Sequence, residues 1–502
     1  MAKDMQITIP ETFGQILKDA QDFFYSERLT AFLVGGMVRD MVLGRATADA
    51  DITLNTNVFS VAKRLAMVLG GKPVTMDAEN GTVRIVLPDS GNYIDITTMR
   101  GDIHEDIYRR DFTINALAVP LENISRKNGA LAVFDTSAII DPSGGMADLE
   151  NKILRAVSHE AFRQDAARLL RAVRLTAEYG LKITPETKQL IRRDAPLAAN
   201  IAGERTREEL LRLFSLPEAG EAAKLLDQLG ILTAIIPELE AARGVSQPGW
   251  HHWAVLEHSL RTIDAVSFVL RRAGCSFAPA DALEEVPWSA DLEQHFKTSI
   301  SQRATRYTMV NLAALLHDIA KPETRTIDEN GRERFINHPA LGSELCEAIL
   351  KRLRLSKKET QIVQLMVKYH LRPNQMANEG LPTVRAIYRF FRETDDTGID
   401  ILFLSLADHL ATRGPTLIWQ EWQRHTGLVG HVLAERTREA ARVVPPRLIT
   451  GDDLIQALDL TPGPLVGRLL SGIAEARAAG EISNQAEALA LAKKLLYEEK
   501  SL

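Results

Sequence analysis

The stretch that decides the fold reads AFLVGGMVRDMVLGR over residues 31–45 and continues as ADADITLN over residues 48–55. Its first six residues form a short apolar run that ends in two glycines, which is typical of a buried strand that breaks into a tight loop. The following residues place apolar side chains at helical spacing until Gly44 ends the helix. ADADITLN then alternates in the manner of a strand. This order of strand, loop, helix and strand predicts a mixed α and β domain.

Outward from this stretch, strand signals continue for a while and then nearly vanish. TVRIVLP (82–88) and NYIDITTM (92–99) read as further strands, because β-branched residues run between Gly, Pro and Asn. From Leu154 onward, helical periodicity dominates. Four segments carry apolar residues at spacings of three and four: 159–180, 185–194, 204–214 and 218–229. The predicted fold class is therefore α+β, a head with a mixed sheet followed by an all-α remainder.

Length and composition restrict the class of protein. A chain of 502 residues is about three times the usual ~150-residue domain. Its hydrophobic (45%) and charged (25%) fractions are those of a globular protein. No apolar run reaches the ~18 residues of a membrane span, and the N-terminus lacks a secretory signal. The two cysteines, Cys275 and Cys346, fit a reducing compartment. We therefore expect a cytoplasmic protein with no membrane contact.

Carboxylates follow the glycine loop. Asp49 and Asp51 are two residues apart on a predicted strand, so both side chains leave the same face. Two such carboxylates repel each other unless cations lie between them, and hard oxygen ligands suit Mg²⁺. Asp95, on another predicted strand, completes a candidate two-metal site. Gly35 and Gly36 let backbone amides approach a triphosphate. Either pattern alone is usually a turn or a solvated strand end, but their combination is far more specific.

A family resemblance rests on these motifs. GGMVRD followed by DAD resembles the signature of the DNA-polymerase-β-type nucleotidyltransferases, in the branch that contains tRNA CCA-adding enzymes and bacterial poly(A) polymerases. RRDFTINA (109–116) resembles a second motif of these enzymes, and residues 141–157 resemble the segment that closes their head. The resemblance implies a polymerase-β-like head with catalytic Asp49, Asp51 and Asp95, of which the first two bind Mg²⁺. It also implies a nucleotide-binding set: Gly35, Gly36, Arg39, Arg109, Arg110, Asp111 and Asn115.

The next motif concerns base selection. Residues 162–174, FRQDAARLLRAVR, read as one helix, on which Asp165 and Arg168 share a face. A carboxylate accepts hydrogen bonds and a guanidinium donates them, so the pair can imitate the Watson–Crick edge of a base. The family's EDxxR motif selects CTP or ATP in this way, with Gln164 here in place of Glu. A surface salt bridge worth ~0.3–0.5 kcal/mol is the simpler alternative. Two arginines complete the predicted set, Arg171 and Arg174.

Positive charge gathers in the same region. Between Lys152 and Phe214 the chain has thirteen basic and eight acidic residues, whereas the whole protein has 60 basic and 66 acidic residues and a net charge of −6. A basic segment beside a catalytic domain is where an RNA end is expected to enter. ERTREEL (204–210) resembles a later element of the same family. We therefore expect tRNA as a partner, together with CTP and ATP.

A histidine-rich block follows. LLHDIAKP (315–322), with a histidine upstream and an aspartate far downstream, resembles the HD-domain signature. The implied core ligands are His258, His317, Asp318 and Asp408, and a second ion is assigned to His338 and His370. Nitrogen and carboxylate ligands together suit Mn²⁺, Fe, Ni²⁺, Zn²⁺ or Mg²⁺, so the identity of this divalent metal stays open. The resemblance implies metal-dependent phosphoester hydrolysis as a second activity. The alternative is a metal-stabilised scaffold for RNA.

The motifs divide the chain into four predicted parts. They are a nucleotidyltransferase head (1–153), a helical neck that selects the nucleotide and binds RNA (154–245), an HD domain (246–415) and a helical RNA-binding tail (416–502). The predicted activity is tRNA nucleotidyl transfer that adds CCA, or part of it, to tRNA 3′ ends.

Three alternatives remain open for the activity. Only eight residues (101–108) separate Arg100 from Arg109, where many family members have a longer flexible loop, so a CC-adding or A-adding specialist is one alternative. A poly(A) polymerase ranks lower, because residues 52–65 lack the Gly-basic-basic-Phe run that marks those enzymes. The third alternative belongs to another class of enzyme: an HD phosphohydrolase whose head only binds nucleotide.

Overall fold

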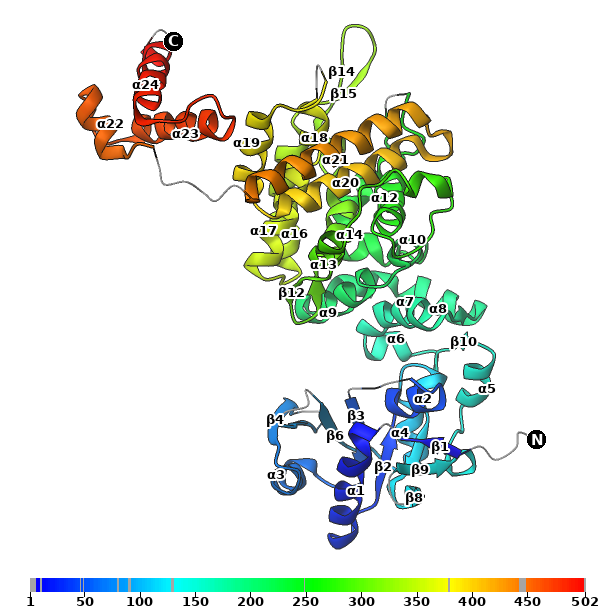
Figure 1. Ribbon diagram of the computed structural model, residues 1–502. Coiled ribbons are helices and arrows are strands. Elements are labelled where there is room, and N and C mark those ends of the chain that lie inside the picture. Colours follow the sequence, from blue (N-terminus) through cyan, green and yellow to red (C-terminus); the bar gives the residue numbers. More distant parts are fainter. Residues whose placement is uncertain are drawn as a thin grey trace. The chain divides into compact units, whose positions relative to one another are not determined.

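A computed structural model describes residues 6–9, 11–45, 47, 49–78, 81–88, 92–127, 131–247, 249–377, 380–441 and 448–500. The chain divides into two compact units (Figure 1). The first unit comprises Met1–Ile201 and Leu229–Ala234, and the second comprises Ala202–Gln228 and Ile235–Leu502. The predicted limits of head, neck, HD domain and tail stay predictions.

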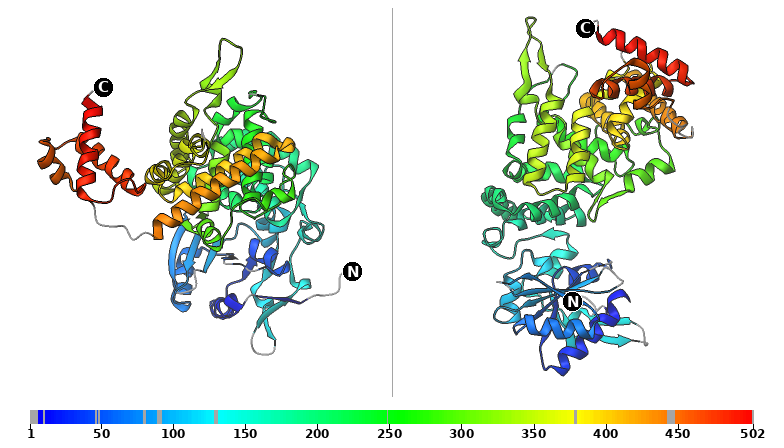
Figure 2. Two further views of the ribbon diagram at one scale, coloured as in Figure 1. Left: turned by 45° about the horizontal axis from the view of Figure 1, so that its top comes forward. Right: turned by 90° about the vertical axis from the view of Figure 1, so that its left-hand side faces the viewer.

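A six-stranded mixed sheet forms the centre of the first unit (Figure 2). Its strand order is β4-β5-β6-β3-β2-β7, in which only the β3–β6 pair is parallel. The strands are β2 (Ala31–Val34), β3 (Asp49–Leu54), β4 (Lys72–Asp77), β5 (Thr82–Val86), β6 (Tyr93–Thr98) and β7 (Ala118–Pro120). The strands predicted from AFLVGG, ADADITLN, TVRIVLP and NYIDITTM are confirmed, as is the mixed character of the sheet.

Strand alternation separates the core from the carboxylates. Helices α1 (Glu11–Ser26) and α3 (Val58–Val68) pack in one hydrophobic cluster with Ala50, Ile52 and Leu54 of β3. Asp49 and Asp51 alternate with these residues, so they lie on the opposite face of the sheet. The apolar face thus fixes the register of β3, because a slip by one residue would bury the carboxylates in the core.

The predicted helix over residues 162–174 is wrong in one respect. It is two helices, α6 (Ala161–Gln164) and α7 (Ala167–Tyr179), with extended backbone at Asp165 between them. The Asp165 carboxylate accepts the amide of Ala167 at 3.1 Å, which satisfies an amide at the start of α7. Short polar side chains such as Asp compete with helical hydrogen bonding in this way and favour helix starts.

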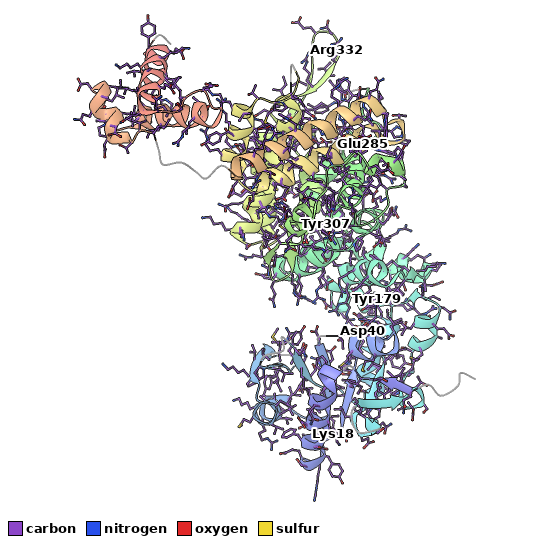
Figure 3. The ribbon with its side chains drawn as sticks, viewed as in Figure 1. Lys18, Asp40, Tyr179, Glu285, Tyr307 and Arg332 are labelled. Atoms are coloured by element: carbon purple, nitrogen blue, oxygen red, sulfur yellow. The ribbon has the colours of Figure 1, made fainter. Side chains whose placement is uncertain are left out.

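The second unit is almost entirely helical. Three of its helices are buried nearly all round: α12 (Val255–Val269), α14 (Arg306–Leu316) and α20 (Thr397–Arg413). They pack with α10 (Ala219–Gln228) and α17 (Lys357–Tyr369), and α16 (His338–Arg352) packs against α17. A hairpin of β14 (Arg325–Ile327) and β15 (Glu333–Phe335) extends from them, with Arg332 near its tip (Figure 3). No helix among the described residues is both long and apolar enough to cross a membrane.

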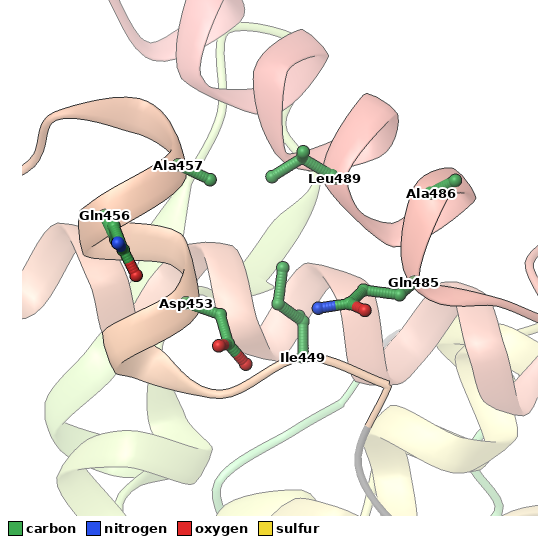
Figure 4. Close-up of a pocket in the computed structure, with 7 residues that line it drawn as sticks. All are labelled: Ile449, Asp453, Gln456, Ala457, Gln485, Ala486 and Leu489. Atoms are coloured by element: carbon green, nitrogen blue, oxygen red, sulfur yellow. The ribbon is translucent and has the colours of Figure 1, made fainter.

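The end of the chain forms its own small hydrophobic cluster. Helices α22 (Gly451–Leu458), α23 (Pro464–Ala478) and α24 (Gln485–Lys500) pack around Leu454 and Leu469. A pocket of about 490 Å³ lies here, lined by apolar side chains, two glutamines and Asp453 (Figure 4). Thr450 and Asp453 form a capping box at the start of α22.

Candidate active site

Three carboxylates meet on the open face of the sheet. β3 and β6 pair in parallel with Asp51 directly opposite Asp95 and Asp49 opposite Tyr93. Neighbouring strands lie about 4.8 Å apart, so side chains on one face of paired positions are in reach of each other. The structure therefore brings together the three acids that the sequence predicts.

Asp51 is the most constrained of the three. Burial raises the pKa of its carboxyl to about 6, and the charges of Asp95 and Asp49 add to this shift. The Arg110 guanidinium opposes the shift, and Arg110 Nε is itself buried without a hydrogen-bond partner among the described residues. A half-buried carboxylate beside two others fits a cationic ligand, because a divalent ion offsets the repulsion that partial burial strengthens.

Arg84 on β5 holds the third acid. Its Nε and Nη2 donate to the two carboxylate oxygens of Asp95 at 2.8 and 2.7 Å. The same guanidinium lies over the Tyr93 ring, 3.6 Å from the ring centroid. The Tyr93 hydroxyl hydrogen-bonds to Asp49, and burial together with this carboxylate raises the pKa of the phenol. Arg84 and Tyr93 thus link Asp95 to Asp49 across the sheet.

The glycine loop fits closely against these groups. Gly35 has φ 76°, and a Cβ at this position would lie 3.0 Å from Arg110 Nη1 and 3.1 Å from Asp51 Oδ2. Glycine is required here by both the backbone conformation and the space. Its amide donates to the carbonyl of Leu117 at 3.1 Å, so this N–H is engaged within the protein. Gly36 begins α2 (Gly36–Val42).

Arg39 lies in the interior. Its guanidinium donates to Asp40 at 2.9 and 3.0 Å, to the Tyr179 hydroxyl at 2.7 Å and to Asn115 Oδ1. The side chain of Arg39 is only 8% exposed. Tyr179 also donates to Asp40 at 2.7 Å, and both residues are labelled in Figure 3. The network joins the glycine loop to the end of α7, a contact that the sequence did not predict.

The RRDFTINA segment also connects to α7. Asp111 accepts from Asn115 at 3.0 Å and from Arg171 at 3.0 Å. Burial opposes ionisation of Asp111, but Arg171 and Asn115 outweigh it and lower the pKa. Arg110 is paired with Asp106 at 3.1 Å, and Arg109 is exposed. Of the predicted nucleotide-binding residues of this segment, Asp111 and Asn115 therefore form one hydrogen-bonded group with Arg171, and the side chains of Arg109 and Arg110 lie outside it.

Arg168 is anchored mainly to the backbone. It donates to the carbonyl oxygens of Arg109 (2.8 Å), Arg110 (3.3 Å) and Ala161 (3.1 Å). The Gln164 amide oxygen, at the family's Glu position, accepts from it at 3.5 Å. Arg174 is buried and pairs with Glu178 at 2.6 Å.

A second group of candidate ligands lies in the second unit. His258 on α12, His317 at the end of α14 and the following Asp318 form one trio; Asp318, His338 and His370 form another. His258 Nε2 lies 3.2 Å from His317 Nε2 and 3.0 Å from an oxygen of Asp408 on α20. Asp318 turns Oδ2 toward the first trio and Oδ1 toward the second. All six predicted HD residues are thus brought together.

The imidazole rings are oriented for metal binding. The Nδ1 atoms of His317, His338 and His370 lie 2.7–2.8 Å from backbone carbonyls. A carbonyl only accepts, so each Nδ1 carries the proton and each Nε2 faces the cluster with a lone pair, as in histidine metal sites. Burial lowers the pKa of His370 to about 3. Burial opposes protonation of His317 too, but the Asp318 and Asp408 carboxylates raise its pKa, so a cation there would replace a proton.

Three residues of the two candidate sites, Arg84, Tyr179 and Lys321, were not predicted from the sequence. Arg84 is one polar residue in an apolar strand, and Tyr179 has no local signal. Lys321 Nζ lies 2.6 Å from Asp318 Oδ2. Of the three residues, only Lys321 could have been predicted from spacing, because it follows Asp318 by three residues in HDIAK.

Comparison with known proteins gives the family. Four family models match: the poly A polymerase head domain (31–104 and 101–155), a probable RNA and SrmB-binding site of polymerase A (180–243), the HD domain (299–413) and a tRNA nucleotidyltransferase domain 2 (447–492). An A-adding tRNA nucleotidyltransferase of Deinococcus radiodurans is 31% identical over 92% of this chain and 95% of its own. The chain belongs to the class II tRNA nucleotidyltransferase family.

Other relatives agree with this membership. A CC-adding tRNA nucleotidyltransferase of Thermus thermophilus is 31% identical over 95% of both chains. The fold resembles the Thermotoga maritima CCA-adding enzyme complexed with tRNA, with a TM-score of 0.59 at 21% identity over 97% and 96% of the chains. It also resembles the Bacillus stearothermophilus CCA-adding enzyme in complex with CTP (TM-score 0.59, 21% identity, 97% and 99%). Polymerase heads and HD domains of these families depend on divalent metals. The predicted fold class is confirmed.

Proposed function

We propose that this chain transfers nucleotides from CTP or ATP to the 3′ end of tRNA. The terminal 3′-hydroxyl oxygen forms a bond to the α-phosphorus, the bond from that phosphorus to the pyrophosphate oxygen breaks, and the hydroxyl loses its proton. The observation that carries the proposal is the pairing of β3 with β6, which sets Asp49, Asp51 and Asp95 together on the face away from the core. Because the substrate is tRNA, we expect the protein in the cytoplasm.

Each group of residues has its own role in the proposal. Asp49 and Asp51 would hold Mg²⁺, which supplies positive charge for the attacking hydroxyl and the leaving pyrophosphate. Arg110 lies beside Asp51 with a donor that has no described partner, so it is suited to a phosphate oxygen. Arg84 positions Asp95. Asp165 and Arg168 select the base. They do not lie on one continuous helix, and main-chain oxygens hold the Arg168 guanidinium in place.

We propose further that the enzyme adds only part of CCA. The connection from β6 to α4 (Ile103–Tyr108) is four residues long, Met99 to Asp102, where a longer loop would be expected in an enzyme that switches between bases. In addition, three curated sequence relatives at 29–31% identity that match over more than nine-tenths of both chains are named A-adding or CC-adding enzymes, whereas the CCA-adding enzymes that match over as much of the chain do so at only 21% identity.

The decisive experiment uses three tRNA substrates, which end before CCA, after C and after CC. Each is incubated with the purified chain, Mg²⁺ and CTP, ATP or both, and the 3′ ends are sequenced. A specialist extends by two cytidines or by one adenosine only, and full CCA from CTP plus ATP contradicts the specialist proposal. Asp49→Asn and Asp51→Asn should abolish incorporation while tRNA binding persists; retained incorporation would overturn the metal assignment. Arg168→Ala should reduce discrimination against other nucleotides, and unchanged selectivity would contradict its role.

A second activity, metal-dependent phosphoester hydrolysis, is favoured by the histidine cluster. Asp318 bridges two trios of ligands, and the imidazoles of His317, His338 and His370 are held in the metal-binding tautomer. We propose that the second unit hydrolyses ribonucleotide phosphoesters when loaded with a divalent metal. His317→Ala should abolish this hydrolysis and leave nucleotide incorporation intact. An unchanged hydrolysis rate would assign the activity elsewhere.

A further inference from the structure

A cavity of about 430 Å³ in the second unit borders the histidine cluster. It is lined by His338 and its neighbours Phe335 to Ala340, and by residues on both sides of His370: Lys368, Tyr369, Leu371, Arg372 and Gln375. His338 and His370 belong to one trio of candidate metal ligands, with Nε2 atoms 3.4 Å apart. The cavity therefore has a candidate metal-ligand histidine in its wall.

The lining has a marked charge. Lys368 and Arg372 are both cationic, and none of the described residues that line the cavity carries a carboxylate. Neither cation forms an ion pair within the described part of the chain, although most arginines there do. Arg372 Nε is shielded from solvent and has no described hydrogen-bond partner. Leaving a buried donor without a partner is costly, so such a donor indicates a missing acceptor.

The pocket near the end of the chain gives a contrast within the same unit. The tail pocket is lined by Asp453, two glutamines and apolar side chains, without Lys or Arg among its described residues. An anion would be repelled there. The cavity near His338 combines two cations without an ion pair among the described residues, an unsatisfied guanidinium donor and an adjacent candidate ligand histidine; Lys368 Nζ also lies 5.4 Å from the Tyr369 ring centroid.

We propose that this cavity binds the phosphate of a ribonucleotide phosphomonoester, with Arg372 and Lys368 as its anion ligands. Arg372 presents the guanidinium donors that suit phosphate oxygens, and Lys368 adds a second charge at the rim. The phosphate then lies beside His338, at the edge of the trio. The inference names the substrate class and the binding residues of the second activity proposed above, and it rests on that activity only for its catalytic consequence.

Binding measurements test the proposal directly. Full-length protein is titrated calorimetrically in EDTA with inorganic phosphate, adenosine 3′-monophosphate and a short RNA ending in a 3′-phosphate. Arg372→Gln should weaken binding of the phosphomonoesters about 10- to 100-fold, because a charge-assisted hydrogen bond to phosphate is lost. Arg372→Lys should have an intermediate effect. Lys358→Gln, an exposed change on α17 outside the cavity, is the control; Arg372 itself begins α18 (Arg372–Gln375).

Equal affinities of Arg372→Gln and Lys358→Gln for all three probes would overturn the proposal. The relative affinity for the mononucleotide and the RNA identifies the source of the phosphate. Hydrolysis separates this inference from the proposed activity. If the wild type hydrolyses phosphomonoesters and Arg372→Gln does so with unchanged KM, the activity stands and the cavity assignment falls. If the wild type binds phosphate through Arg372 but hydrolyses nothing with any divalent metal, the cavity stands and the activity falls.

Discussion

Replacing Asp51 by Asn should make the metal-free first unit more stable while it abolishes catalysis. Burial raises the pKa of Asp51 from 3.8 to about 6. One pKa unit corresponds to 1.36 kcal/mol, so the ionised carboxylate destabilises the folded state by about 3 kcal/mol at pH 7. Because the folded pKa is the higher one, this cost is absent below pH 3.8 and develops fully as pH rises through 6. Asn has no charge and avoids the cost.

Hydrogen exchange of the β3 and β6 amides in EDTA measures this effect within the full chain. Asp51→Asn should slow exchange at pH 7 by up to about 100-fold relative to wild type, and the free-energy difference should fall to about half at pH 5. Mg²⁺ should reduce the difference in exchange rate between Asp51→Asn and wild type, because only the wild type has the Asp51 carboxylate whose charge the ion offsets. Glu122→Gln, an exposed change in the same unit, serves as control.

The chain offers an internal check on this measurement. All five tryptophans, Trp250, Trp253, Trp288, Trp419 and Trp422, belong to the second unit. Unfolding followed by tryptophan fluorescence should therefore be the same in Asp51→Asn and wild type. If Asp51→Asn exchanges as fast as wild type, or faster, at pH 7 in EDTA, then the carboxylate is not destabilising and the reasoning fails.

Three further predictions concern groups around the carboxylates. Arg84→Gln should lower kcat about 10- to 100-fold and raise the Mg²⁺ concentration needed for half-maximal rate, because two charge-assisted hydrogen bonds to Asp95 are lost. Arg84→Lys should recover part of the lost kcat. Wild-type kinetics in Arg84→Gln would contradict the role of Arg84 in positioning Asp95. Tyr179→Phe should reduce the free energy of unfolding by about 1 kcal/mol in urea titration, and no change would mean that its hydroxyl bonds contribute nothing. Gly35→Ala should impair incorporation at least about 10-fold without loss of tRNA binding, because the φ of 76° and the contacts to Arg110 and Asp51 exclude a Cβ; normal incorporation would show that the loop adapts.

The sheet and its carboxylates were predictable because strand alternation is a local property. In ADADITLN, successive side chains point to opposite faces of the strand, so every second residue enters the core. This alternation alone places Asp49 and Asp51 on the same face. The third acid was found in the same way. Its pairing opposite Asp51 depends on a parallel crossover, which the sequence indicates only through the order of strands and helices.

Contacts between distant segments could not be predicted. Asp165 interrupts a pattern with continuous helical spacing, because its extended backbone ends α6 and its carboxylate accepts the Ala167 amide at the start of α7. Arg39 resembles a phosphate ligand in the motif but is enclosed by Asp40, Asn115 and Tyr179, the last of which is 140 residues away. Period and spacing do not encode such partners. The HD ligands are also distant in sequence, and only the family resemblance joined them.

The anchoring of Arg168 has a consequence for how base selectivity changes during evolution. A main-chain carbonyl is present whatever residue occupies positions 109, 110 and 161, so substitutions there leave these acceptors of the guanidinium in place. Gln164 is a side-chain acceptor and lacks this protection. Substitutions at positions 109, 110 and 161 thus leave the orientation of Arg168 unchanged, whereas a single substitution at position 164 can change that orientation and, with it, base selection.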